Sequence, residues 1–188
     1  MYCPHCRYDV DIAALSETRL ADEGSLCEAD AGYTFFWKGL PHDARRIHGV
    51  GFAIRSSLLA QITESLVGIN ERLMTLHLPL IKGRFMTVVS AYAPTLVSDE
   101  TTKDSFYSCL HATLQAVPRN DRLVILGDFN AWVGTNHNVW SGVIRKHGFG
   151  NANSNGLRLL NLCCEFGLVI TNTLFQQRNQ RSWDASQV

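Results

Sequence analysis

The chain has 188 residues, of which 46% are hydrophobic, and its 17 Lys and Arg residues balance its 17 Asp and Glu residues. This length and hydrophobic content are sufficient for one sizeable core, and no linker-like stretch argues for a second domain. A net charge of zero excludes a protein that holds nucleic acid mainly by neutralising many phosphates, so any nucleic-acid contact must be local and modest.

The sequence has no apolar run with the length of a secretory signal or of a membrane span. We therefore expect an intracellular chain without membrane contact. The cysteines lack the spacing of a disulfide framework, which predicts reduced and mostly buried thiols; they lie at positions 3, 6, 27, 109, 163 and 164.

Apolar runs separated by turn residues occupy much of the chain and predict a strand-rich fold. A continuous apolar run is typical of a strand that is buried on both faces, so several of these strands are expected in the protein interior. The predicted strands cover residues 10–16, 33–37, 50–54, 73–78, 85–91, 123–126 and 168–171.

Two helices are predicted among these strands. The first covers residues 99–116, and Pro118 ends its apolar pattern. The second covers residues 155–166, and Gly167 supplies the left-handed residue that stops it. The residues expected on the buried faces are Phe106, Cys109, Leu110, Leu114 and Val117 in the first helix, and Leu157, Leu160 and Cys164 in the second.

Polar residues follow three of the apolar runs at the point where each run stops. Glu17 follows the first predicted strand and Tyr92 the fifth, while Asp128 and Asn130 follow the sixth. If these strands lie side by side, their ends form one acidic pocket, which is the arrangement that a hard divalent cation and a phosphate ester require. The Gly- and Asn-rich span 134–156 is predicted to be a surface loop near this pocket.

Each of these residues also has a structural explanation. Glu17 alone is typical of a solvated carboxylate that marks a strand end. Asp128 and Asn130, two positions apart, are also typical of an Asx turn that caps a strand. Tyr92 is also typical of a packing residue at a strand end. The functional interpretation is favoured because all three of these features occur at the C-terminal end of a predicted strand.

Three ordered motifs resemble those of the endonuclease/exonuclease/phosphatase superfamily. They are Ser16-Glu17-Thr18-Arg19-Leu20, Ser90-Ala91-Tyr92-Ala93-Pro94 and Gly127-Asp128-Phe129-Asn130-Ala131. Other stretches are similar to the endonuclease domains of non-long-terminal-repeat retrotransposons and their craniofacial-development-protein-2-like relatives; these are residues 32–37, 49–53, 70–74 and 155–160. The resemblance covers about residues 9–183.

The resemblance implies an α/β fold, a four-layer α/β sandwich, and cleavage of DNA phosphodiesters that depends on Mg²⁺ or Mn²⁺. It implies that Glu17 binds the metal and that Tyr92 contacts the phosphate. It further implies that Asp128 positions or deprotonates the attacking water, and that Asn130 orients this Asp and stabilises the charged transition state. Oxygen ligands of these types suit a hard cation.

Ser182 and Trp183 resemble the Ser/Thr-Trp element that faces the substrate backbone, a match that rests on two residues. The sequence also departs from the family pattern. The metal-binding Asn of the family's first strand should precede Val10 but is missing, and none of the seven histidines follows an Asp, so the Asp-His pair has no candidate. We therefore expect a domain that is truncated at both ends, with an incomplete sandwich and impaired activity.

Residues 1–9 are interpreted as a nonnative or unstructured N-terminal extension, and residues 10–188 as the truncated endonuclease domain. Within the extension, Cys3-Pro4-His5-Cys6 resembles the redox centre of thioredoxin-like oxidoreductases, which requires a preceding strand and a following helix. A single CxxC also supplies only half of a structural zinc site. A redox or zinc-binding module is therefore a distant third alternative.

The sequence thus predicts a DNA endonuclease of retrotransposon type with a partial Mg²⁺ site and weak or no activity. The alternative from another functional class is a noncatalytic remnant that at most binds nucleic acid or a partner protein. Whether the chain is an enzyme is left open, because the catalytic His has no candidate. An active enzyme would work on DNA in the nucleus.

Overall fold

The structure is a computed structural model that describes residues 10–59, 62 and 66–176. It divides into two compact units, one formed by Met1–Tyr92 and Ala116–Asp128 and the other by Ala93–Gln115 and Phe129–Val188. No helix among the described residues is long and apolar enough to cross a membrane. The prediction of a single domain over residues 10–188 stays a prediction.

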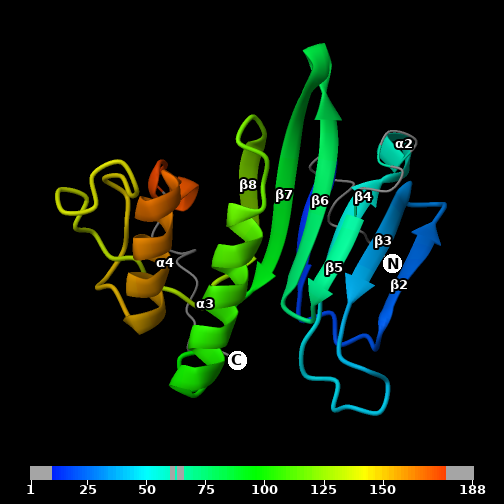
Figure 1. Cartoon of the computed structure of the whole chain (residues 1–188), viewed down its shortest axis with the longest axis horizontal. Helices are drawn as coiled ribbons and strands as arrows, with labels where there is room; N and C mark the ends of the chain where they lie inside the picture. Colours follow the sequence, from blue (N-terminus) through cyan, green and yellow to red (C-terminus); the bar gives the residue numbers. More distant parts are fainter. Residues whose placement is uncertain (1–9, 60–61, 63–65, 177–188) are drawn as a thin grey trace. The chain divides into compact units, whose positions relative to one another are not determined.

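The described residues of the first unit include eight strands (Figure 1). They are β1 (Ile12–Ser16), β2 (Glu23–Glu28), β3 (Tyr33–Lys38), β4 (Val50–Arg55), β5 (Leu66–Asn70), β6 (Leu73–Leu80), β7 (Arg84–Tyr92) and β8 (Arg122–Asp128). One sheet has the order β1-β4-β3-β2 and the other β5-β6-β7-β8, and every neighbouring pair is antiparallel except β7 and β8. Short helices follow β4 and β6: α2 (Ser56–Leu59) and the 3-10 turn η1 (Ile81–Gly83).

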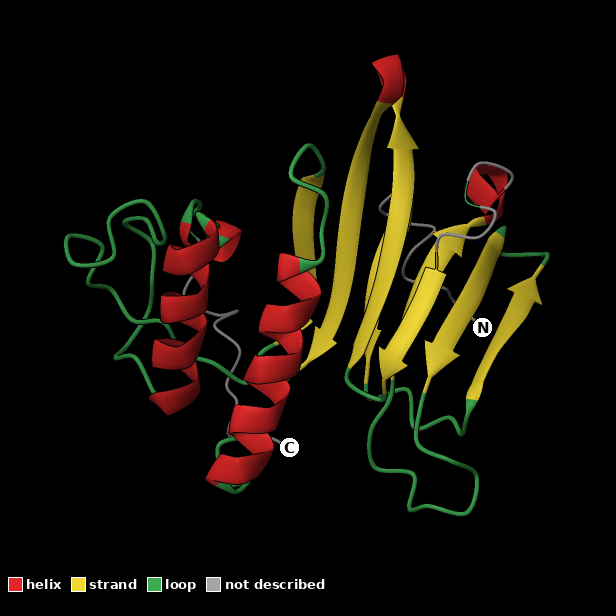
Figure 2. Cartoon of the chain, in the orientation of Figure 1, coloured by secondary structure: helices red, strands yellow, loops and turns green. Residues whose placement is uncertain are grey.

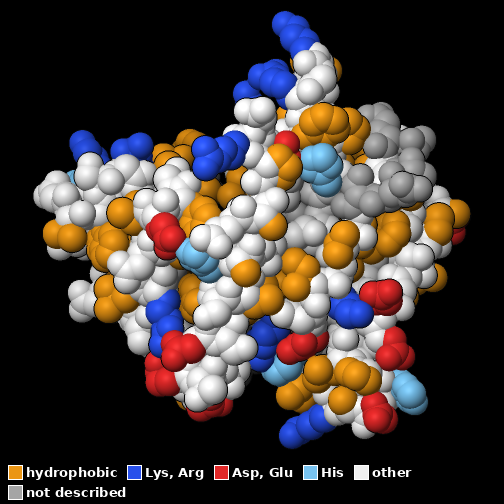
Figure 3. Space-filling model, viewed as in Figure 1, with side chains coloured by type: hydrophobic (Ala, Val, Ile, Leu, Met, Phe, Trp, Pro, Cys, Tyr) orange, Lys and Arg blue, Asp and Glu red, His pale blue; other side chains and the backbone are white. Residues whose placement is uncertain are grey.

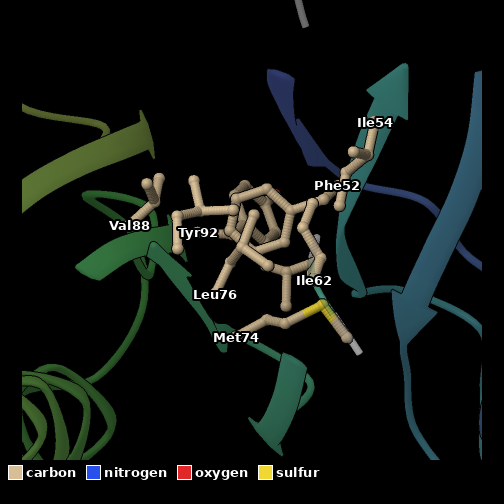
Figure 4. Close-up of a cluster of buried hydrophobic side chains, with 9 residues drawn as sticks. Phe52, Ile54, Ile62, Met74, Leu76, Val88 and Tyr92 are labelled. Carbon is tan, nitrogen blue, oxygen red and sulfur yellow. The ribbon is translucent and has the colours of Figure 1, made fainter. Parts of the chain in front are cut away.

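The two sheets enclose one hydrophobic core. Side chains alternate between the two faces of a strand, so every second residue of β4 and β6 faces the interior. Figure 4 shows the side chains of this core converging from strands of both sheets. Its buried members are Val50, Phe52 and Ile54 of β4, Met74, Leu76 and Leu78 of β6, Val88 and Tyr92 of β7, and Ile62.

The parallel strands β7 and β8 end side by side. Their register pairs Ala91 with Gly127 and Tyr92 with Asp128. Gly127 has a φ of +139°, and a Cβ atom at this position would overlap the carbonyl oxygen of Ala91. Glycine therefore permits the close approach of the two strands that brings Asp128 beside Tyr92.

We expect Gly127→Ala to lower the free energy of unfolding by about 2–4 kcal/mol. The added methyl group would overlap backbone atoms of Ala91, and alanine would be strained at this positive φ. Gly83→Ala is the matched control: its φ is +66°, but no atom lies within 4 Å of the added Cβ. Gly83→Ala should therefore lower the free energy of unfolding by only about 1 kcal/mol, the cost of a residue other than glycine at a positive φ. Urea denaturation measures both values, and equal losses would show that the approach to Ala91 imposes no constraint.

The second unit contains the helices α3 (Glu100–Gln115) and α4 (Ser154–Phe166) and the 3-10 turn η2 (Thr171–Thr173), drawn in red in Figure 2. At the start of α4, the side chain of Asn153 accepts a hydrogen bond of 2.7 Å from the backbone N–H of Gly156. Gly167, with a φ of +64°, ends the helix as predicted.

An arginine connects the two long helices. Arg158 of α4 donates hydrogen bonds to Asp104 at 2.6 Å and to Glu100 at 2.8 Å, both on α3. Its guanidinium carbon also lies 5.9 Å from the centre of the Tyr107 ring. In α3 the predicted apolar face is buried at Phe106, Leu110 and Leu114.

The strand prediction is wrong in three places. The sequence did not predict β2 and β5, and residues 168–171 form no strand. The N–H of Leu168 instead donates to the carbonyl of Cys163 at the end of α4, and the N–H of Ile170 donates to Val143. In addition, β8 is not fully buried, because within the described chain it lies at a sheet edge with exposed and half-buried residues.

The predicted buried face of α4 is also wrong in part. Leu157 is 46% exposed and Cys164 is exposed, whereas Leu159, Leu162 and Cys163 are buried in addition to Leu160. Cys163 is the one buried thiol among the four cysteines in the described ranges, so the prediction of mostly buried thiols is wrong for these residues.

Candidate active site

Glu17 follows β1 directly and has a φ of +53°, which is uncommon for a residue other than glycine. The backbone after it is held by a second segment of the first unit. The N–H of Thr18 donates to the carbonyl of Gly49, and the N–H of Arg19 donates to that of His48, both at 3.1 Å. These bonds fix the backbone that carries the Glu17 carboxylate.

Tyr92, the last residue of β7, reaches this carboxylate. Its ring is packed in the hydrophobic core and only 4% of the residue is exposed (Figure 4). Its hydroxyl group donates a hydrogen bond of 2.6 Å to Oε1 of Glu17, while Oε2 of Glu17 accepts a bond of 3.1 Å from Arg19. The structure thus joins two predicted site residues that are 75 positions apart in sequence.

The Tyr92–Glu17 bond and its surroundings set the protonation state of both groups. Burial, followed by the bond to Glu17, raises the pKa of Tyr92 to about 12, so its hydroxyl group remains a donor at neutral pH. The bond from Tyr92, assisted by Arg19, lowers the pKa of Glu17, whose side chain is 39% exposed. Glu17 is therefore an ionised carboxylate that keeps access to solvent.

We expect Tyr92→Phe to raise the pKa of Glu17 toward its ordinary value, because the strongest hydrogen bond to the ionised form is lost. A carboxyl group whose pKa is lower in the folded protein than in the unfolded chain stabilises the fold at pH values above its pKa in the unfolded chain. This stabilisation is lost as the pH falls through the pKa of the group in the folded protein. The variant should therefore lose less stability on acidification. A carbon-13 NMR titration of Glu17 measures the shift. Tyr107→Phe, in the second unit, is the control and should leave Glu17 unchanged.

Asp128 is the third predicted residue of this unit. It ends β8, is exposed, and is the register partner of Tyr92. Its negative charge contributes to the raised pKa of Tyr92. Tyr92 is therefore adjacent to both acidic residues: Glu17 through a hydrogen bond and Asp128 through strand pairing.

Two further residues adjoin this group that the sequence analysis assigned no role. Arg72, only 9% exposed, donates to the carbonyl of Tyr92 at 3.2 Å, and its Nη2 lies 2.9 Å from Nε2 of His48. The ring of His48 is centred 6.1 Å from that of Tyr92. Arg72 lies in the stretch of residues 70–74 that contributed to the family resemblance. This resemblance is the sequence feature that could have identified Arg72 as a site residue.

Asn130 belongs to the second unit and also has a positive φ, +46°. Its side-chain amide donates to the carbonyl of Ala93 at 2.9 Å. Its own carbonyl accepts a bond of 3.1 Å from the side chain of Asn155, which also donates to Pro94 at 2.8 Å. These bonds hold the start of the second unit together, and the predicted catalytic role of Asn130 stays a prediction.

The donor chemistry of the first unit suits a magnesium ion. No group of three His, Cys, Asp or Glu residues within the described ranges is arranged to hold a metal. Mg²⁺, however, usually keeps several waters and takes one or two protein carboxylates together with substrate phosphates. The ionised, partly exposed carboxylate of Glu17 can supply one such ligand.

Several predicted sites lie outside the described residues. Ser182 and Trp183, proposed from the resemblance to face the substrate, are among residues 177–188, and Cys3 and Cys6 are among residues 1–9. Their predicted roles stay predictions.

The sequence model of the Endonuclease/Exonuclease/phosphatase family matches residues 7–163. The chain belongs to this family. The match includes the segments that carry Glu17, Tyr92 and Asp128, and it confirms the resemblance on which their roles were predicted. Membership in the endonuclease/exonuclease/phosphatase family supports a hydrolase of nuclease type.

Two curated relatives that this chain matches are the craniofacial development protein 2 of Bos taurus and that of Tragulus javanicus. The first is 32% identical over 181 residues and the second 31% identical over 180 residues. The matches cover 93% of this chain but only 28% and 29% of those proteins. The chain therefore spans less than a third of the length of these relatives.

The fold is similar to that of the crystal structure of an AP endonuclease from Leishmania major. The TM-score is 0.56 at 13% sequence identity, and the match covers 86% of this chain and 59% of that one. At this identity the likeness shows the fold alone. Together with the two sheets of the first unit, it confirms the predicted α/β fold of the endonuclease/exonuclease/phosphatase type.

Proposed function

We propose that this chain is a divalent-metal-dependent phosphodiester hydrolase of the retrotransposon-endonuclease type, and that it cleaves DNA in the nucleus. The observation that supports this most is the 2.6 Å hydrogen bond from Tyr92 to Glu17. It places an ionised carboxylate, a neutral phenol and, through strand pairing, the Asp128 carboxylate in one part of the first unit. Family membership supports the reaction class.

Each residue of this group has a defined part in the proposed reaction. Glu17 would hold Mg²⁺ or Mn²⁺, which supplies positive charge beside the scissile phosphate. Tyr92 keeps its proton and orients the Glu17 carboxylate by donating to Oε1. Asp128 accepts the proton of the attacking water. For Asn130, Ser182 and Trp183 the roles implied by the family resemblance remain proposals.

We further propose that these 188 residues alone cleave DNA slowly. None of the seven histidines in the sequence follows an Asp, so the Asp-His pair that the family resemblance leads us to expect is missing from them. One transition-state hydrogen-bond donor typically contributes about 10²- to 10³-fold in rate. The same observation supports the second candidate function, a noncatalytic remnant that binds nucleic acid or a partner protein.

The charge distribution favours weak, local contact with DNA. The sequence carries no net charge. Figure 3 shows described Lys and Arg side chains in small groups with hydrophobic and acidic side chains beside them. Affinity from phosphate neutralisation should therefore be small, and assays need low salt and long incubation.

A supercoiled-plasmid nicking assay with Mg²⁺, Mn²⁺ or chelator tests the proposal. We expect slow nicking that requires the metal and is lost in Glu17→Gln. The matched control is Glu165→Gln, on an exposed glutamate of α4 that pairs with His111. Nicking equal to that with chelator, even at high protein concentration, would contradict the hydrolase and leave the noncatalytic function.

A further inference from the structure

A buried arginine holds Tyr92 from several directions. Nη1 of Arg72 donates to the carbonyl of Tyr92 at 3.2 Å, and the guanidinium carbon lies 5.4 Å from the centre of the Tyr92 ring. The backbone N–H of Tyr92 in turn donates to the carbonyl of Arg72 at 2.9 Å. One residue therefore contacts the backbone and the aromatic face of Tyr92.

The same guanidinium also fixes His48. Nη2 of Arg72 lies 2.9 Å from Nε2 and 3.4 Å from Nδ1 of the imidazole. An arginine can only donate, so Nε2, the nearer ring nitrogen, must be the acceptor, and His48 is held in its neutral form with the proton on Nδ1. The carbonyl of His48 accepts the N–H of Arg19, two residues after Glu17. Arg72 thus contacts both segments that adjoin Glu17.

This arrangement is a costly way to stabilise a fold. Arg72 is 9% exposed, and the carboxylate of its ion-pair partner Glu71 is 3.9 Å from Nε. A buried charge at that distance from its counter-ion is usually less stabilising than an apolar residue of similar volume. Its contacts are instead directed at the residues around Glu17, which points to a role in the site.

We propose that Arg72 is a positioning residue of the site: by holding Tyr92 and His48, it keeps the Tyr92 hydroxyl group on the carboxylate of Glu17. This inference rests on the proposed metal-dependent function. The planar fork of arginine makes several directed bonds and stacks on a ring at once, which the ammonium group of lysine cannot do. Charge alone should therefore be insufficient at this position.

The main experiment measures Mn²⁺ binding to the full chain by the electron paramagnetic resonance signal of free Mn²⁺. We expect Arg72→Met to weaken Mn²⁺ binding about 10- to 100-fold, as is usual when the group supporting a metal ligand is lost. Arg72→Lys should recover less than half of this loss on a logarithmic scale. Because Arg72 acts through Tyr92, the double variant Arg72→Met/Tyr92→Phe should bind Mn²⁺ no more weakly than whichever of the two single variants has the lower affinity.

Arg158→Met is the matched control. Arg158 also pairs with carboxylates and lies over a tyrosine ring, that of Tyr107, but it belongs to the second unit. Its loss should leave Mn²⁺ affinity within about twofold, which is the scatter expected for an uncoupled site. Urea denaturation of each variant identifies any that fail to fold.

A second readout separates failure of this inference from failure of the proposed function. In protein labelled with carbon-13 tyrosine, the Cζ signal of Tyr92 is assigned by its loss in Tyr92→Phe. Arg72→Met should move it toward the value of free tyrosine, and Arg158→Met should not. If Arg72→Met moves the Tyr92 signal but the protein binds no Mn²⁺, the proposed metal site is refuted and the positioning of Tyr92 by Arg72 is supported. An unmoved signal, unchanged Mn²⁺ affinity in Arg72→Met, or additive losses in the double variant would overturn the role of Arg72.

Discussion

Asp128→Asn is expected to reduce metal-dependent cleavage by this chain about 100-fold, or to the level measured with chelator if that is reached first. The substitution keeps the size of the side chain but removes the carboxylate that accepts the proton of the attacking water in the proposed reaction. Asp128 is exposed and lies at the end of an edge strand, so its loss should have little effect on folding. The measurement is the initial rate of plasmid nicking.

Asp104→Asn is the control, because Asp104 is also an exposed aspartate but pairs with Arg158 on the helices of the second unit. It should leave the rate unchanged. Asp128→Asn should also lower the pKa of Tyr92, since the charge of Asp128 contributes to raising it. Metal-dependent nicking that persists unchanged in Asp128→Asn would refute the assigned role, and an altered pKa of Tyr92 would then show only that the two residues are close.

The core of the candidate site could be predicted from the sequence because strand ends are visible in it. An apolar run that stops at a polar residue marks the edge of a sheet, and this argument selected Glu17, Tyr92 and Asp128. For the last two residues the structure shows the geometric basis of the expected proximity: parallel strands in register bring Tyr92 and Asp128 to the same edge. Asn130 follows the same run but lies in the other unit, where its amide holds Ala93.

Arg72 and His48 could not be predicted in this way. Neither ends an apolar run. Arg72 lies beside Tyr92 because β6 pairs with β7, with Leu73 opposite Ala91, and the position of His48 depends on how its segment pairs with the one that follows β1. Such pairing is a tertiary property that leaves no periodicity in the sequence. The sequence therefore assigned no role to His48, and for Arg72 it offered only the family resemblance of residues 70–74.

Errors in the predicted fold have similar physical causes. β2 is largely exposed and begins and ends with glutamate, so it lacks an apolar face that would reveal it. The face of α4 was misassigned because leucine and cysteine occur all around the helix. Its orientation is set by polar contacts instead: Asn155, fully buried, donates to the carbonyls of Pro94 and Asn130 and thereby selects the face that is buried.

The largest effect on stability is expected for Phe52→Ala, at about 3–5 kcal/mol in the free energy of unfolding. Phe52 is fully buried on β4, an inner strand of its sheet, and belongs to the core shown in Figure 4. Removing its ring leaves a cavity between two sheets whose backbones are fixed by hydrogen bonds on both sides, so the core can relax only in part. Urea denaturation of the purified chain gives the value.

Ile81→Ala is the control for this substitution, because Ile81 lies in η1 of the same unit and is 75% exposed. Its loss should change the free energy of unfolding by less than about 0.5 kcal/mol. If Phe52→Ala lowers the free energy of unfolding by less than about 1 kcal/mol, and the slope of that free energy against urea concentration is unchanged, the sheets do not enclose Phe52 in solution. Since Tyr92 packs in the same core, Phe52→Ala should also loosen its ring, and metal-dependent cleavage should fall even where the protein remains folded.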